Sequence, residues 1–207
     1  MVDGPVLVLV RHSVPEIDPS RPGREWSLSP EGSRRARQLA PCLAPYHLEV
    51  LVSSEEPKAV QTAAIIGEEL GLPPEVVPGL HEHDRSGVVG LDREAFLGAI
   101  ARTFAHPGER VFGAESADED RERFAGVLGQ LLARYPERNL CVVAHGTVLS
   151  LYLAERERSD AYALWQRLGL PCCFVLSRPD LHLTEWVEKV SFSCSGGWSC
   201  SGDGGMV

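Results

Sequence analysis

The stretch Val6–Ser13 constrains the fold of this chain more than any other. It reads Val-Leu-Val-Leu-Val-Arg-His-Ser and follows Gly4-Pro5. Five consecutive aliphatic residues are typical of a strand buried on both faces, as the inner strands of parallel sheets are. The strand ends in a cation, Arg11, and an imidazole, His12. Because open α/β sheets bind ligands at the carboxyl ends of their parallel strands, the pair predicts an anion site with a candidate nucleophile. Taken alone, the two residues could equally cap a strand.

A second segment, Leu140–Thr147, repeats this pattern. Its aliphatic run again ends in a histidine, His145, which is followed by Gly146 and a stretch with helical character to about Glu157. If both strands are parallel in one sheet, His12 and His145 emerge at the same edge. The sequence therefore predicts that the two imidazoles face one cavity.

The bulk properties are those of a single globular domain. The chain has 207 residues, a formal net charge of -9, 43% hydrophobic residues and 24% charged residues. A chain of this size can bury roughly 70% of its unfolded surface in one core. The acidic balance argues against nucleic acid or an anionic membrane as a partner, but a few clustered cations can still attract an anionic substrate.

The ends and the cysteines of the chain bear on its location. The N-terminus shows no secretory signal, and no apolar run approaches the roughly 20 residues that span a bilayer. Four cysteines, Cys42, Cys141, Cys172 and Cys173, fall in expected helix or strand and are interpreted as reduced core residues. We therefore expect a cytoplasmic protein. From residue 190 onward Ser, Gly and Cys dominate, which predicts a domain over residues 1–189 and a disordered tail over residues 190–207.

Several short motifs resemble those of the histidine phosphatase superfamily, the phosphoglycerate mutase-like proteins. They are Arg11-His12 after the first strand, Leu28–Gly32, Ser53-Ser54 followed by Ala59–Ala63, Leu80–Glu82, Gly113–Ser116 and Val142–Gly146. The matches occur in family order and span roughly residues 6 to 187. The resemblance implies a three-layer α/β/α sandwich with a mostly parallel sheet.

The same resemblance implies roles for individual residues. His12 would form a phosphohistidine, and Arg11, Lys58 and a protonated, catalytic His145 would surround the phosphoryl group. Backbone N–H groups at the start of the helix after Gly146 would also bind phosphate, and Glu82 would act as a protonated catalytic acid. No metal and no cofactor are required.

Two positions depart from the family pattern. Lys58 stands where an arginine is usual, and it keeps the charge but lacks the planar fork that binds two oxygens. Ser13 stands where a glycine is usual, and its hydroxyl is a candidate phosphate donor.

The ionisable segment Leu80–Gly87 admits three interpretations. It could be a solvated loop, a metal site built on His81 and His83, or the loop that carries the catalytic acid Glu82, which the resemblance favours. Further candidate contacts to the substrate are Arg21, Arg24, His83 and Arg85, although solvated loop charges are the favoured interpretation for Arg21 and Arg24.

These observations favour an acid-type phosphatase that hydrolyses phosphomonoesters. The expected partner is a phosphorylated small molecule or a phosphoprotein, and the sequence gives no oligomeric state. One alternative is phosphoryl transfer of the phosphoglycerate mutase type, which uses the same core residues but for which the segment from Glu82 to Asp118 is short. The other is a weakly active phosphate-binding module, which the presence of Lys58 in place of the usual arginine would indicate.

Overall fold

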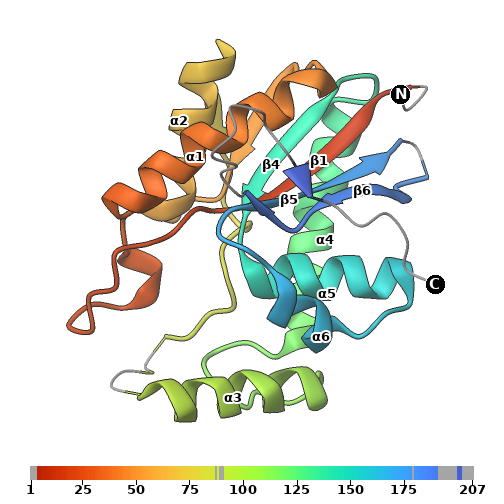
Figure 1. Ribbon diagram of the computed structural model, residues 1–207. Coiled ribbons are helices and arrows are strands. Elements are labelled where there is room, and N and C mark those ends of the chain that lie inside the picture. Colours follow the sequence, from red (N-terminus) through yellow and green to blue (C-terminus); the bar gives the residue numbers. More distant parts are fainter. Residues whose placement is uncertain (1–3, 87, 89–90, 179, 191–199, 202–207) are drawn as a thin grey trace.

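The computed structural model describes residues 4–86, 88, 91–178, 180–190 and 200–201 (Figure 1). A six-stranded sheet forms its centre, with the strand order β3-β2-β4-β1-β5-β6. The strands are β1 (Val6–Arg11), β2 (Val50–Ser53), β3 (Pro74–Val76), β4 (Leu140–Ala144), β5 (Cys172–Ser177) and β6 (Leu183–Val187). Strands β3, β2, β4 and β1 run parallel, whereas β5 is antiparallel to both of its neighbours. The expected mostly parallel sheet is therefore confirmed.

The register of β1 against β4 determines where the two histidines lie. Arg11 pairs with Ala144, and the N–H of His12 donates to the Ala144 carbonyl at 2.9 Å. His12 and His145 are thus the next residues on two adjacent parallel strands. The prediction that both emerge at one edge of the sheet is confirmed.

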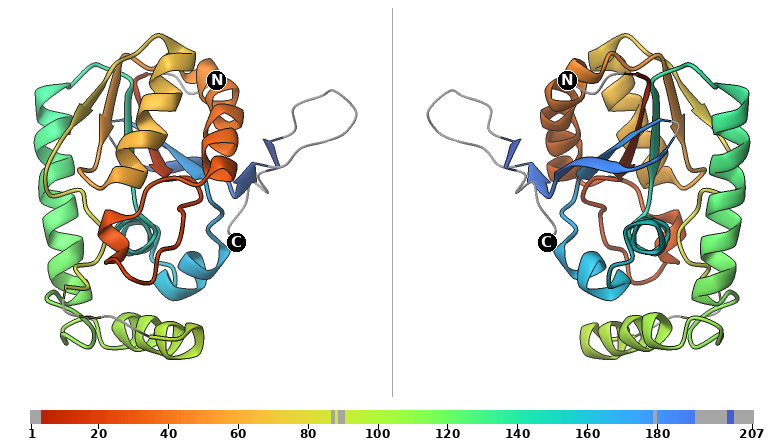
Figure 2. Two further views of the ribbon diagram at one scale, coloured as in Figure 1. Left: turned by 90° about the vertical axis from the view of Figure 1, so that its left-hand side faces the viewer. Right: turned by 90° about the vertical axis from the view of Figure 1, so that its right-hand side faces the viewer.

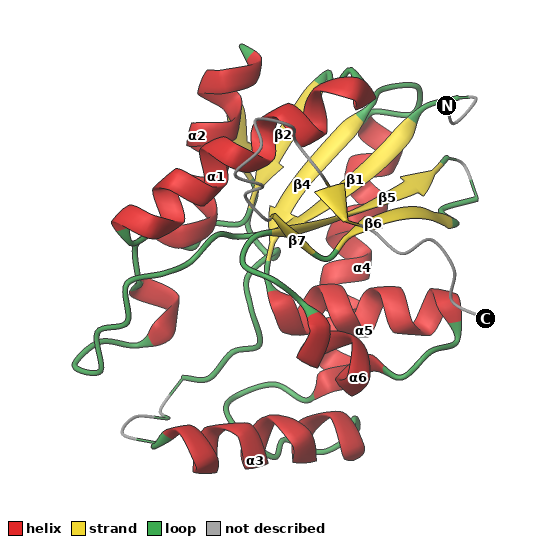
Figure 3. Cartoon of the chain, viewed as in Figure 1, coloured by secondary structure: helices red, strands yellow, loops and turns green. Residues whose placement is uncertain are grey.

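Helices cover both faces of the sheet, which gives the three layers expected from the sequence (Figures 2 and 3). On one face lie α1 (Pro30–Leu43) and α2 (Pro57–Leu70), and on the other lie α4 (Ala117–Arg134), α5 (Gly146–Glu157) and α6 (Ala161–Arg167). Alternate residues of β1 face the two layers: Leu7 and Leu9 pack with the α4 and α5 side, and Val8 and Val10 pack with the α1 and α2 side. This explains why β1 is an uninterrupted aliphatic run.

Helix α3 (Arg93–Ala105) lies apart from the sheet, beyond α5 and α6 (Figure 1). Of its residues only Ile100 and Thr103 are buried, and it packs mainly on α6. The helix follows its sequence signal, since the Asp92 side chain caps it by accepting from the N–H of Ala95. Local sequence therefore predicts that the helix exists but not where it packs.

Most element boundaries agree with expectation to within about two residues. Helix α1 begins as predicted, with Ser29 accepting from the Gly32 N–H and Pro30 in the first turn. Two strands differ from expectation. The sequence pattern predicts strands over 75–78 and 181–187, whereas β3 ends at Val76 and β6 begins at Leu183. Pro78 lacks the N–H that would extend the pairing of β3, and the Leu181 N–H donates to the Ser177 carbonyl in the turn before β6.

The C-terminal region is described only in part. A two-residue strand β7 (Lys189–Val190) pairs antiparallel with β8 (Cys200–Ser201). The remaining residues of the expected tail lie outside the described residues, so its disorder stays a prediction. Burial raises the pKa of the Cys141 and Cys172 thiols to about 12, which suits inert core residues. Within the described ranges, no helix combines the length and apolarity that a membrane span needs.

Candidate active site

His12 and His145 form a pair of buried imidazoles at the centre of the site. Their ring centroids are 5.0 Å apart and their planes are inclined at 57°. His12 follows the last residue of β1, and His145 is the N-cap of α5 immediately after β4. Two neighbouring parallel strands that are each followed by a histidine thus place both rings side by side.

Backbone contacts select the tautomer of His12. Its Nδ1 lies 2.7 Å from the carbonyl oxygen of Ser13, which can only accept a hydrogen bond. Nδ1 therefore carries the proton, and Nε2 keeps a lone pair. That arrangement is the one a nucleophilic imidazole needs.

Burial and neighbouring charge hold both rings in the neutral form. Burial lowers the pKa of His12, and His145, Lys58 and Arg11 lower it further. Burial also lowers the pKa of His145, with Lys58 the largest contribution from a neighbouring charge. A neutral His12 matches the predicted nucleophile. The protonated His145 expected from the sequence differs from what these surroundings favour, and it would need the negative charge of a phosphate beside it.

Arg11, the residue before His12, supplies a cation to the site. Its Nη1 donates to the Leu168 carbonyl at 2.8 Å, which anchors the guanidinium. Gly146 allows the close approach, since a Cβ on Gly146 would lie 3.0 Å from both Cζ and Nε of Arg11. A side chain at this position would therefore crowd the guanidinium and force it to shift.

Lys58, in the first turn of α2, supplies a second cation. Its ammonium group is buried between the carboxylate of Glu56 and the carbonyl of Gly23, to which it donates at 2.7 Å. The Lys58 charge lies close enough to lower the pKa of both histidines, but the ammonium group is held by a carboxylate that sequence reasoning did not assign.

Glu82 is ionised rather than protonated. Burial raises its pKa, but Arg85, His145 and the backbone N–H groups of His83 and Thr147 outweigh burial, so the net shift is downward. Both of its oxygens accept from the Thr147 N–H at 3.1 Å, at the start of α5. This corrects the expectation of a protonated acid. At the start of α5 Glu82 occupies the Thr147 N–H, and a phosphate contact through Gly146 at this helix start stays a prediction.

Several polar atoms of the site are buried without a partner. Among the described residues, these atoms include Arg11 Nε, Ser13 Oγ, Arg85 Nε and His145 Nδ1. Buried polar groups are rarely left unsatisfied, and three of these four atoms belong to donors. Unpartnered donors on residues of this site suit the binding of a small oxyanion.

The remaining candidate substrate contacts divide into two groups. Arg85 faces the site, with Nη2 3.3 Å from Thr147 Oγ1 and 3.8 Å from Glu82. Arg24 is exposed and interacts electrostatically with Asp84, and Arg21 is exposed and pairs with Glu25. For these three arginines a role in substrate binding stays a prediction.

His83 is engaged inside the protein instead of facing a substrate. Its Nδ1 contacts the Asp120 carboxylate, its Nε2 lies 2.5 Å from the Phe112 carbonyl, and its side chain is fully buried. Burial lowers the pKa of His83, but Asp120 outweighs burial and the net shift is upward. The suggested substrate contact is therefore replaced by a structural one. Among the described residues, no three His, Cys, Asp or Glu side chains are grouped to hold a metal ion.

Sequence reasoning missed three residues of this region. Ser54 accepts from or donates to His145 Nε2 at 2.8 Å, Glu56 holds Lys58, and Arg123 of α4 binds the loop that carries Glu82. Ser54 lies in the Ser53-Ser54 motif but had no role assigned to it, and Glu56 gave a second local signal. It occupies the N-cap position before Pro57, where Ser, Thr, Asp and Asn are preferred.

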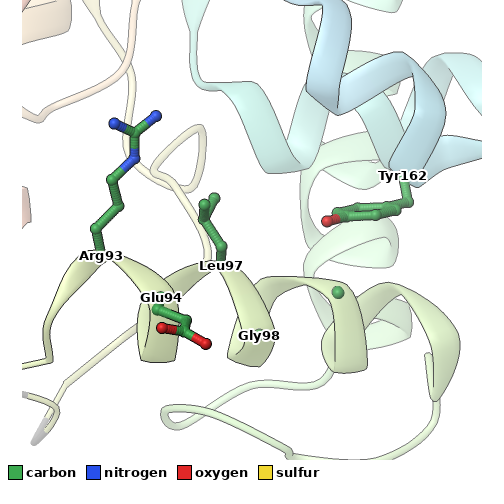
Figure 4. Close-up of a pocket in the computed structure, with 6 residues that line it drawn as sticks. Arg93, Glu94, Leu97, Gly98 and Tyr162 are labelled. Atoms are coloured by element: carbon green, nitrogen blue, oxygen red, sulfur yellow. The ribbon is translucent and has the colours of Figure 1, made fainter.

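A shallow open groove of about 500 Å³ lies between α3 and α6 (Figure 4). Leu97 rises from α3, and the ring of Tyr162 extends from α6 on the other side. Its lining contains none of the site residues predicted from the sequence. The groove is therefore distinct from the cluster of buried charges around the histidine pair.

Comparison with known proteins places this chain among phosphate-handling enzymes. The family model of the histidine phosphatase superfamily (branch 1) matches residues 7–187. The chain is 28% identical over 162 residues to the uncharacterized phosphatase PhoE of Bacillus subtilis, with 78% of this chain and 79% of the relative covered. It is 26% identical over 205 residues to a 2,3-bisphosphoglycerate-dependent phosphoglycerate mutase of Cytophaga hutchinsonii, with 89% and 94% covered.

Solved structures share the fold. A mycobacterial glucosyl-3-phosphoglycerate phosphatase in complex with VO3 has a TM-score of 0.70 and 22% identity, with 87% of this chain and 96% of that chain covered. A phosphoserine phosphatase mutant of Entamoeba histolytica in complex with phosphoserine has a TM-score of 0.71 and 18% identity, with 87% and 95% covered. At these identities the likeness establishes the architecture.

Proposed function

The chain belongs to branch 1 of the histidine phosphatase superfamily, and from that premise we propose that it is a phosphatase that hydrolyses phosphomonoesters through a phosphohistidine on His12. The observation that carries the proposal is the pair of buried, neutral imidazoles 5.0 Å apart, with unpartnered donors around them. The phosphatase PhoE of Bacillus subtilis supports it as a relative.

The first step would be attack by Nε2 of His12 on phosphorus. Arg11, Lys58 and Arg85 would stabilise the phosphoryl oxygens, and Ser13 Oγ and His145 Nδ1 would add hydrogen bonds. Glu82, held at the start of α5, would carry a proton to the leaving oxygen. In the second step Glu82 would take a proton from the water that cleaves the phosphohistidine, and acid–base help of this kind contributes roughly 10² to 10⁴ in rate.

The finer points of the assignment belong to the same proposal. We expect the reaction to need no metal, because the groups around the phosphoryl position are cations and hydrogen-bond donors. We expect activity to be favoured at acidic pH, because the surroundings of His12 keep it neutral below its ordinary pKa. A cytoplasmic location, and a phosphorylated metabolite or phosphoprotein as substrate, stay predictions.

Replacement of the proposed nucleophile tests this function directly. His12→Ala should lower turnover of an aryl phosphate by at least about 1,000-fold, because no other group in the site can form the covalent intermediate. His106→Ala, which replaces the exposed histidine at the C-terminal cap of α3, is the matched control. Retention of a tenth of the activity by His12→Ala, with folding intact by circular dichroism, would exclude His12 as nucleophile.

Phosphoglycerate mutase activity is the second candidate, and the relative from Cytophaga hutchinsonii favours it. Incubation with 3-phosphoglycerate distinguishes the two. A phosphatase releases inorganic phosphate, whereas a mutase returns the phosphoryl group to an isomeric product. Binding of vanadate without turnover of any phosphomonoester would instead indicate a phosphate-binding module.

A further inference from the structure

Glu56 is a buried carboxylate that contacts three parts of the candidate active site. Its Oε2 pairs with the ammonium group of Lys58, and its Oε1 accepts from the backbone N–H of Glu82 at 2.8 Å. The same Oε1 lies 3.8 Å from Nε2 of His145. Glu56 is only 6% exposed, and acidic residues are seldom buried to this extent unless they are paired.

The position of Glu56 on α2 shows that its carboxylate is turned toward the site. Glu56 is the N-cap residue, and its carbonyl accepts from the N–H groups of Ala59 and Val60. Its side chain accepts no capping bond from the first turn of the helix. An N-cap acid usually binds those N–H groups, so the carboxylate has given up a favourable local contact for the contacts with Lys58 and Glu82.

The charges around the phosphate position nearly cancel. Lys58 is paired with Glu56, and Arg85 lies 3.8 Å from Glu82. Arg11 has no carboxylate within ion-pair distance in the described part of the chain, and both histidines are held neutral. The site therefore presents about one net positive charge to a ligand.

Three groups lie next to Glu56: the ammonium group of Lys58 on α2, the N–H of Glu82 on the loop before α3, and the imidazole of His145 after β4. The charged or titratable groups next to these partners are His81 and Arg85 on the same loop and Arg11 and His12 at the end of β1. Among these groups Glu56 is the one whose removal would leave Lys58 as an unpaired cation. Its charge thus controls how much negative charge the site can attract.

We propose that Glu56 is a specificity-determining residue, which makes the site select the monoanion of a phosphomonoester over the dianion by neutralising Lys58. This inference rests on the proposed function and concerns the same site. A phosphomonoester loses its second proton with a pKa of about 6, so the two forms exchange near neutral pH. One net positive charge in the site matches the monoanion, whereas the dianion is left with uncompensated charge.

The monoanion also supplies the proton that the structure does not place on Glu82. As His12 Nε2 bonds to phosphorus and the P–O bond to the leaving group breaks, the proton on the phosphoryl group passes through the Glu82 carboxylate to the leaving oxygen. The products are a neutral alcohol and a phosphohistidine that keeps the single negative charge. Water then cleaves the P–N bond, which releases the phosphate monoanion and restores neutral His12.

Glu56→Gln tests the proposal, because the amide keeps the shape and an acceptor for the Glu82 N–H but removes the charge. The readout is kcat/KM for phosphoserine between about pH 5 and about pH 8, a range that brackets the second phosphate pKa of about 6. In the wild type we expect a steep fall across this range as the dianion replaces the monoanion. In Glu56→Gln the fall in kcat/KM should be smaller by about tenfold. The substitution removes the repulsion between the Glu56 carboxylate and the second negative charge of the phosphate, and an interaction between two unit charges in such a site is worth about that factor.

Glu55→Gln is the matched control. Glu55 is the acidic residue immediately before Glu56, and its exposed carboxylate contacts His81. Its pH profile should superimpose on that of the wild type. A Glu56→Gln profile that also superimposes, or that falls by one factor at every pH, would overturn the proposal, since a merely structural role predicts the latter.

Binding of inorganic phosphate by calorimetry provides a second readout that does not require turnover. Phosphate affinity should fall with rising pH in the wild type and fall about tenfold less in Glu56→Gln. Equal pH dependence in both proteins would contradict the inference. Failure of the wild type to hydrolyse any phosphomonoester would contradict the proposed function instead, so the two failures are distinguishable.

Discussion

At the scale of single residues, Lys58 is the main departure from the family's usual site. An arginine would bind two phosphate oxygens at once, and its loss would be expected to cost about 1.5 to 3 kcal/mol if nothing compensated. In the structure Glu56 and the Gly23 carbonyl fix the ammonium group, and Arg85 brings a guanidinium to the same site. The positive charge of the site therefore comes from Lys58 and Arg85 together, with Glu56 fixing the position of the Lys58 ammonium group.

Two substitutions at position 58 separate charge from shape. Lys58→Arg should maintain or raise turnover of an aryl phosphate, because the charge is kept and both acceptors that hold Lys58 can also accept from a guanidinium. Lys58→Met should lower kcat/KM by about 10- to 100-fold, through loss of one charge-assisted contact to phosphate. Steady-state kinetics on both variants gives the answer. A collapse in Lys58→Arg would show that the pocket is shaped for lysine alone.

At the scale of elements, helix α4 holds the loop that carries Glu82. Arg123 Nη1 donates to the carbonyls of Gly79 at 2.9 Å and His81 at 3.0 Å, and the guanidinium pairs with Glu115 and Asp120. These partners are buried or half-buried. A helix on one face of the sheet thereby fixes the backbone on which the proposed proton carrier stands.

Replacement of Arg123 should weaken both the fold and the site. Arg123→Met leaves Glu115 without its cation and Asp120 with His83 as its remaining partner, and breaking a buried ion pair costs about 3 to 5 kcal/mol. Arg121→Met, on the same helix, removes ion pairs to Asp118 and Glu155 at the surface and should cost less than about 1 kcal/mol. Urea unfolding of both variants, with kcat measured alongside, checks this. Equal losses in the two variants would contradict a special role for Arg123.

The contrast between α3 and β1 shows what sequence predicts at this scale. The aliphatic run of β1, its histidine and the matching end of β4 follow from local pattern, so their convergence was predictable. The contacts of Arg123 with Gly79 and His81 join residues 44 and 42 positions apart, and no local period encodes them. For the same reason sequence predicted the charge of Lys58 but not its pairing, and the acid at position 82 but not its ionised state.

At the scale of the whole molecule, the site lowers the stability of the fold in acid. His12 and His145 are buried, and burial lowers the pKa of each below the value of about 6.5 that an unfolded chain gives. Below that pH the unfolded state binds more protons at these positions than the folded state does. The free energy of unfolding must therefore decrease as pH falls from about 6.5 toward the lowered pKa values.

Substitution of both histidines should remove this loss. Each histidine contributes about 1.4 kcal/mol per pH unit in that window, so the wild type should lose about 2 to 4 kcal/mol between about pH 7 and about pH 5 beyond what the double variant His12→Gln/His145→Gln loses. Comparing the change with pH cancels any difference in packing between the two proteins. His182→Gln, a substitution at an exposed histidine, should retain the wild-type dependence. Urea unfolding at the two pH values measures all three proteins. An equal loss of unfolding free energy in acid for the wild type and the double variant would show that the imidazoles are not held neutral.

Inorganic phosphate should reduce the loss of unfolding free energy in acid in the wild type alone, because a bound anion favours the charged form of the rings and stabilises the fold.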